Sequence, residues 1–139
     1  MARTTAKKST RIAPAARRLP RSVVAAIDAT SYLGVRAGAQ SDHRFIAIWP
    51  VVIAGRVFGR SWTIKPGGWY RTFVDDPLGA IQVGTRVVRV RAQRVRSARI
   101  LDAIERAYAE KYATPGSRKY VRGFRTARRR AATIEFVRR

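Results

Sequence analysis

Apolar and polar positions alternate with a period of two over several short segments, which is typical of β-strands with one buried face. The clearest case is 85–95, where Val88, Val90 and Ala92 alternate with Arg89, Arg91 and Gln93. We therefore predict a strand there with one dry face and one cationic face. The segments 31–37, 56–62, 79–83 and 132–137 have the composition of further strands.

Residues 44–53 differ from these segments because they are apolar on both faces. This pattern predicts a strand covered on both sides, with one face in a barrel core and the other against a helix, a ligand or a second subunit. Pro50 has no backbone N–H, so we expect a bulge or a break in pairing there. Ala54-Gly55 predicts a short hairpin connection to the next strand, and Gly84 predicts a second one.

Helical signals occur in three places. Ser22 is a suitable N-cap for a short helix, and a second short helix at 69–75 is expected to end before Pro77. Ser97 is the predicted cap of the longest helix, which runs through Tyr112 with Leu101, Ile104 and Tyr108 on its apolar stripe. Together the elements predict an α+β fold with about six antiparallel strands, one long helix and two short ones.

Length and composition limit the classes of protein. The chain has 139 residues, of which 46% are hydrophobic, which is enough for one domain with a packed core. It has no cysteine and one histidine, His43, which excludes a disulfide framework and a His- or Cys-based metal site, so we expect no metal. No apolar run approaches the length of a membrane helix, and we expect a cytoplasmic protein.

The charge is strongly positive and unevenly distributed. The formal net charge is +22, and arginine is the main source. Residues 1–21 contain no acid and are predicted to form a basic disordered tail, followed by a single domain at 22–139. Residues 114–130 form a second block without acids. This distribution indicates a polyanionic partner, nucleic acid above all, although a solvated surface accounts for the same charges.

The nucleic-acid hypothesis gives one set of candidate residues. They are arginines of the tail, of the cationic strand face and of the second basic block: Arg17, Arg18, Arg89, Arg91, Arg128, Arg129 and Arg130. No helix-turn-helix, zinc finger or RNA-binding aromatic motif accompanies them, so contacts to phosphate backbones are expected and sequence readout is not. An acidic protein partner is the remaining alternative for these basic segments.

A second set of candidates follows the hairpin at Ala54-Gly55. Arg60 and Ser61 end a predicted strand and have the chemistry to bind phosphate oxygens. Lys65, Gly67 and Gly68 precede the predicted helix and can present an ammonium and backbone N–H groups to the same anion. An ordinary strand end and a plain loop are the alternatives. Trp62, Trp69 and Tyr70 can wall a pocket for a flat ring, and core packing is the alternative for them.

Several short motifs in this order resemble a known family. They are Ala26-Ile27-Asp28-Ala29, Trp49 before Val51-Val52, Gly55, Arg60-Ser61, Trp69-Tyr70-Arg71, and Ala103-Ile104 with Ala107-Tyr108 and Lys111-Tyr112. This succession resembles the bacterial family DUF2255 over residues 20–138. It is also similar to the FMN- and deazaflavin-binding split β-barrel proteins.

The resemblance implies a split β-barrel that forms a homodimer and binds FMN or a deazaflavin (F420-type). The implied cofactor-binding residues are Arg60, Ser61, Trp62, Lys65, Gly67, Gly68, Trp69 and Tyr70. Oxidoreductase activity on an unidentified small molecule is left open, because no general acid, base or nucleophile stands out and a flavin supplies the redox chemistry itself. The catalytic residues are therefore not assigned.

Overall fold

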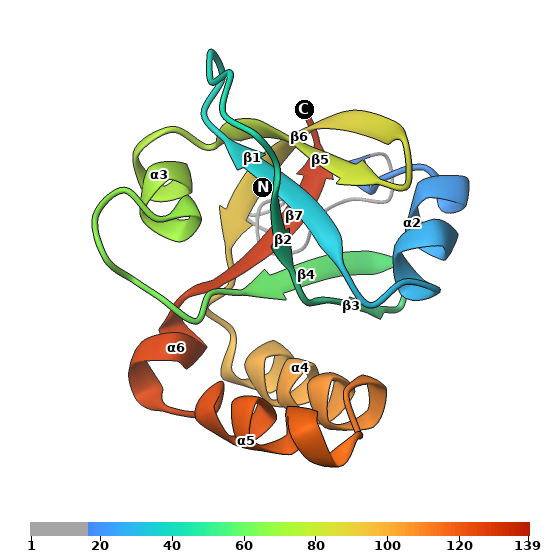
Figure 1. Cartoon of the computed structure of the whole chain (residues 1–139), viewed down its shortest axis with the longest axis vertical. Coiled ribbons are helices and arrows are strands. Elements are labelled where there is room, and N and C mark those ends of the chain that lie inside the picture. The colour runs from blue at the N-terminus through green and yellow to red at the C-terminus, as the bar shows by residue number, and fades with distance from the viewer. Residues whose placement is uncertain (1–16) are drawn as a thin grey trace, which may run out of the picture.

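The computed structural model describes residues 17–139, which form seven strands and five helices (Figure 1). In chain order the elements are α2 (Arg21–Asp28), β1 (Leu33–Ala37), β2 (Ile46–Ile48), β3 (Pro50–Ile53), β4 (Arg56–Arg60), α3 (Trp69–Asp75), β5 (Leu78–Val83), β6 (Arg86–Arg94), α4 (Ala98–Lys111), α5 (Pro115–Gly123), α6 (Ala127–Ala131) and β7 (Thr133–Arg138). Most of the predicted basic tail, residues 1–16, lies outside the described residues.

The seven strands form one sheet in the order β2-β1-β5-β6-β7-β4-β3, and each neighbouring pair is antiparallel. The two edge strands, β2 and β3, are consecutive in the chain and are separated by Trp49 alone. The sheet therefore curls into a nearly closed barrel (Figure 1). The predicted α+β split barrel is confirmed, with seven strands in place of about six.

The predicted strand at 44–53 is in fact two strands. β2 pairs with β1, where Leu33 faces Ile48, whereas β3 pairs with β4, where Pro50 faces Gly59. The expected break at Pro50 is confirmed, and it is the point at which the chain passes from one edge of the sheet to the other. Double-sided burial is wrong for β2, because Ile46 and Ala47 are exposed.

The hairpins and helices mostly follow the sequence signals. Ala54 and Gly55 both have positive φ angles, as a two-residue hairpin turn requires. α3 spans the predicted residues, and the Ser97 hydroxyl accepts a hydrogen bond from the backbone N–H of Ile100 at 3.3 Å, which confirms the cap of α4. The Ser22 cap is wrong: α2 begins at Arg21, and the Ser22 hydroxyl accepts a hydrogen bond from Arg86 at 3.0 Å.

The second basic block is folded as helices α5 and α6, which the sequence patterns did not predict. With α4 they form a helical layer at one end of the barrel (Figure 1). α5 buries Val121, and Phe124 directly follows it as a second buried anchor. The arginines of this block are therefore held on a rigid surface.

Two hydrophobic clusters stabilise the fold. One fills the barrel and includes Ile81 and Phe136, and the other lies between the barrel and the helical layer and includes Phe58 and Tyr108. Leu19 is buried in the first cluster, so the folded part begins before residue 22, where the domain boundary was predicted. Within residues 17–139, no helix combines the length and the apolar character that crossing a bilayer requires.

Candidate functional site

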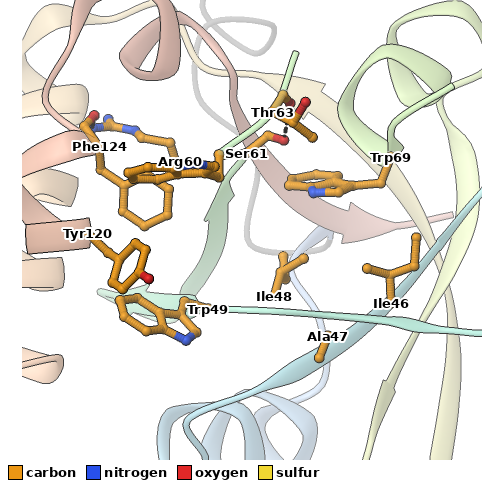
Figure 2. A pocket seen from close by; sticks show the side chains of 11 residues that line it. Ile46, Ala47, Ile48, Trp49, Arg60, Ser61, Thr63, Trp69, Tyr120 and Phe124 are labelled. Atoms are coloured by element: carbon orange, nitrogen blue, oxygen red, sulfur yellow. Dashed lines mark hydrogen bonds between the residues drawn. The ribbon is translucent and has the colours of Figure 1, made fainter. Parts of the chain in front are cut away.

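An apolar cavity of about 370 Å³ lies between the barrel break, the end of β4, α3 and α5. Figure 2 shows Trp69 on one side, Tyr120 and Phe124 on the other, and the β2 residues along a third wall. The lining residues are Ile46, Ala47, Ile48, Trp49, Arg60, Ser61, Trp62, Thr63, Trp69, Tyr120 and Phe124. The end of the hairpin and the tryptophan at the start of α3 therefore meet at one site, as the sequence predicted.

The three tryptophans of the cavity are fixed by other aromatic rings. Trp49 stacks on Tyr112, with ring centroids 4.3 Å apart, and Trp69 packs against Phe136 at 6.3 Å. The edge of Trp62 meets Phe124 at 5.7 Å. Such pairs hold their rings in fixed orientations, so the cavity has rigid, flat walls that suit a planar aromatic ligand.

Arg60 lies in the cavity wall, but its guanidinium is engaged within the protein. The side chain is fully buried, and it donates hydrogen bonds to Thr133 Oγ1 at 2.7 Å, the Phe124 carbonyl at 3.0 Å, Glu105 Oε2 at 3.2 Å and the Leu101 carbonyl at 3.5 Å. Burial lowers the pKa of Arg60, and the charge of Glu105 opposes that shift. The guanidinium that was predicted to bind phosphate therefore bonds to acceptors within the protein, and it links β4 to the helical layer.

The Tyr108 hydroxyl makes a second bridge behind the cavity. It accepts a hydrogen bond from the backbone N–H of Arg60 at 2.9 Å and donates one to the Trp49 carbonyl at 2.6 Å. Complete burial raises the pKa of Tyr108 well above its usual value, so the hydroxyl keeps its proton. This one side chain therefore fixes both the barrel break and the end of β4 to α4.

The structure separates the predicted cofactor-binding residues into groups. Arg60, Ser61, Trp62 and Trp69 line the cavity, whereas Lys65 lines a neighbouring groove and Gly67 lines a different hollow beside β1. The Ser61 hydroxyl donates to the carbonyl of Thr63 (Figure 2). Gly68 caps α3, and Tyr70 is buried with its hydroxyl bonded to the Ala131 carbonyl at 3.2 Å. The phosphate cradle expected around Gly67 and Gly68 is therefore not part of the cavity.

The sequence analysis missed most of the residues that close the cavity. Ile46, Ile48, Tyr120 and Phe124 are among them. Tyr120 lies in α5 and Phe124 caps its C-terminus four positions later, so the helical spacing places both side chains on the same side. This spacing could have predicted a helix within residues 114–130, a segment that the sequence analysis described only as a basic block.

A cationic groove of about 640 Å³ adjoins the cavity and shares Trp62 and Thr63 with it. Its cationic side chains are Lys65, Arg71, Arg128 and Arg129, and its lining contains no carboxylate. Arg129 stacks on Trp62, with the guanidinium carbon 3.5 Å from the ring centroid. The side chain of Trp62 therefore lies between the cavity and the cationic groove.

The arginines predicted to contact nucleic acid lie on three separate parts of the molecule. Arg89 and Arg91 are on β6, and Arg17 and Arg18 precede α2. Arg130 is on α6 and forms ion pairs with Glu105 at 2.6 Å and Asp102 at 2.8 Å, which raise its pKa. Of the predicted set, only Arg128 and Arg129 line the groove.

The nearly closed antiparallel barrel with its helical layer is a split β-barrel. Three solved structures share the fold: a conserved hypothetical protein from Mycobacterium tuberculosis (TM-score 0.56, 13% identity, 89% of this chain and 82% of that one), an F420-H2 dependent reductase (0.51, 18%, 76% and 91%), and a FAD-binding protein from Mesorhizobium loti (0.52, 13%, 87% and 89%). No curated protein matches the sequence.

The chain belongs to the family DUF2255, described as an uncharacterised protein conserved in bacteria, whose pattern matches residues 23–136. The resemblance drawn from the short sequence motifs is thereby confirmed. The match includes every residue that lines the aromatic cavity.

Proposed function

We propose that this protein binds a flavin-type cofactor, FMN or a deazaflavin, with the ring system in the aromatic cavity. The observation that carries the proposal is the cavity itself, which is apolar, walled by three tryptophans and about 370 Å³ in volume. Ligand sites typically span about 300–1,000 Å³ and are lined by apolar and aromatic side chains. The fold is shared with proteins named for F420-H2 and FAD, which supports the same ligand class.

The residues present fit the ring of such a cofactor better than its phosphate. Trp49, Trp62 and Trp69 offer flat apolar surfaces, and Ile48 adds an aliphatic wall. Arg60 and Ser61 already bond to protein acceptors. We therefore assign the tryptophans to ring binding, and we assign Arg60 to holding the cavity wall in place.

The associated activity that we propose is oxidoreduction of a small molecule. A bound flavin supplies the hydride-transfer chemistry, and the protein's part is to bind and orient the ring and to exclude water. The side chains that line the cavity serve both purposes, because they offer flat and apolar surfaces to the ring. The homodimer implied by the resemblance stays a prediction.

The ring-binding proposal is tested by titrating the protein with riboflavin, FMN and a deazaflavin while flavin fluorescence is measured. Ile46 is 48% exposed and its side chain points into the cavity (Figure 2), so Ile46→Trp should block it and weaken binding at least about tenfold, or about 1.4 kcal/mol. Ala109→Trp is the matched control, because Ala109 is exposed on α4 outside the cavity. Failure of the wild-type protein to bind any of the three, or equal binding by the Ile46 variant, contradicts the proposal.

A further inference from the structure

Two exposed aromatic side chains form a shelf where the cavity meets the cationic groove. Trp62 and Tyr120 are each 42% exposed, and their ring centroids lie 5.3 Å apart. Adjacent exposed apolar side chains with a polar rim are typical of a binding surface. We call this pair the aromatic shelf.

Cationic groups lie directly against both rings of the shelf. The Arg129 guanidinium carbon is 3.5 Å from the centroid of Trp62, and its Nε donates to the Trp62 carbonyl at 2.9 Å. The Lys119 ammonium lies 5.2 Å from the centroid of Tyr120. The shelf therefore presents flat apolar surfaces and positive charge at the same place.

The groove beside the shelf extends this charge over a longer path. Lys65, Arg71 and Arg128 are exposed there. Arg130 is the neighbour of Arg129, yet its charge is compensated by Asp102 and Glu105. The sequence contains no acid between Glu110 and Glu135, so the whole α5–α6 surface lacks compensating carboxylates of its own.

We propose that the aromatic shelf and the groove bind single-stranded nucleic acid, with a base stacked on the shelf and the phosphates along Lys65, Arg71, Arg128 and Arg129. Proteins that bind single strands combine aromatic platforms with a cationic groove, and base stacking makes their binding tolerant of sequence. A duplex keeps its bases stacked on one another, so the shelf favours single strands. The net charge of +22 adds long-range attraction for any polyanion. This binding does not depend on the proposed cofactor.

The groove is tested by measuring the fluorescence anisotropy of a labelled oligo(dT) of about 12 nucleotides with the full chain. The double variant Lys65→Ala/Arg128→Ala is compared with Arg89→Ala/Arg94→Ala, which removes the same charge from exposed positions of β6. We expect binding to weaken at least about tenfold in the first variant. The slope of log affinity against log salt should become shallower by about 1.4, because each lost phosphate contact changes it by about 0.7. In the control we expect a change within about threefold, because distant charges are screened.

The shelf is tested separately with Trp62→Leu and with a duplex of the same length. Stacking of one base accounts for a factor of about 5 to 150 in affinity, so the variant should weaken binding of the single strand within that range. The duplex should bind more weakly than the single strand. Oligo(rU) in parallel distinguishes RNA from DNA, and binding of either one supports the proposal.

Three outcomes overturn the inference. The first is no binding of either single strand by the wild-type protein at about 50 mM salt, where electrostatic binding is strong. The second is an equal loss of affinity in the groove variant and the β6 control, which leaves only net charge as the cause. The third is a duplex that binds as tightly as the single strand. Riboflavin titration of the groove variant Lys65→Ala/Arg128→Ala keeps this result separate from the cofactor proposal, because neither residue lines the cavity.

Discussion

The aromatic cavity and the cationic groove share Trp62 as a wall, yet they use arginine in opposite ways. In the cavity wall, Arg60 is 2% exposed and its guanidinium bonds to acceptors from α4, from the residue that follows α5, and from β7. In the groove, Arg128 is exposed, and no carboxylate lines the surface around it. The first arginine holds two layers of the protein together, and the second offers its charge to a ligand. Burial, more than residue type, separates a structural arginine from a binding one.

The largest effect is expected from removing the buried arginine. Arg60→Met removes the hydrogen-bond donor to Thr133 Oγ1 and to the Phe124 and Leu101 carbonyls, and it leaves Glu105 with its ion pair to Arg130. Breaking a buried ion pair and leaving buried polar groups unsatisfied costs about 3–5 kcal/mol of unfolding free energy. Urea denaturation measures the change. The matched control is Arg125→Ala, whose side chain is 67% exposed and 3.9 Å from the same Glu105. That variant should lose less than about 1 kcal/mol. Similar losses of stability in both variants would show that burial does not distinguish Arg60 from an exposed arginine.

A smaller loss is expected from Tyr108→Phe. The change leaves the backbone N–H of Arg60 and the carbonyl of Trp49 unpaired in the interior. An unsatisfied buried polar group costs about 1–3 kcal/mol, so the midpoint of thermal unfolding should fall. Tyr120→Phe, at the exposed shelf, should change stability by less than about 0.5 kcal/mol. A neutral Tyr108→Phe variant would show that the helical layer is not fixed to the barrel by this hydroxyl.

Two glycines of α5 test whether the position of Trp62 matters to both sites. A Cβ on Gly123 would collide with the ring of Trp62, whereas a Cβ on Gly116 would meet nothing within 4 Å. Gly123→Ala should therefore displace Trp62, cost about 1–3 kcal/mol through overpacking and weaken both riboflavin and oligo(dT) binding several-fold. Gly116→Ala should leave binding unchanged and stabilise α5 by up to about 1 kcal/mol. Intrinsic tryptophan fluorescence reports the displacement, and unchanged spectra in Gly123→Ala contradict it.

The smallest effect concerns a carboxylate that belongs to neither site. Asp76 accepts hydrogen bonds from the backbone N–H groups of Ala39 at 2.9 Å and Leu78 at 3.2 Å, and these bonds lower its pKa. Its contribution to stability is therefore present at neutral pH and is lost as the pH falls through the lowered pKa. Thermal unfolding of Asp76→Asn should differ from that of the wild-type protein at pH 7 and converge with it in acid. Asp75→Asn, an exposed neighbour, should behave as wild type.

Local sequence signals predicted the elements of the barrel well. The bounds of α3 follow from Trp69 and Pro77, and the Ser97 cap defines the start of α4. The alternation in β6 appears as buried Val90 and Ala92 beside more exposed arginines. Each of these signals depends on residues that are close together in the chain, so the elements could be predicted from the sequence alone.

The parts that were missed depend on contacts between distant residues. Arg60 has the sequence context of a phosphate ligand, but its partners Glu105 and Thr133 lie 45 and 73 positions away. α5 was missed for a different reason, because its charge concealed the helical signals of Pro115 at the first turn and Val121 and Phe124 at its buried end. Because α5 was not predicted, Tyr120 and Phe124 could not be placed, and the cavity wall that they form was missed.

The most direct test of the central claim is a crystal structure of the protein with bound riboflavin or FMN. We predict density for the isoalloxazine ring in the aromatic cavity, in contact with Trp69 and Ile48 and with the Arg60 side chain still bonded to Glu105 and the Phe124 carbonyl. A ring bound elsewhere on the molecule, with the cavity between Trp49, Trp62 and Trp69 left without ligand, would contradict the account.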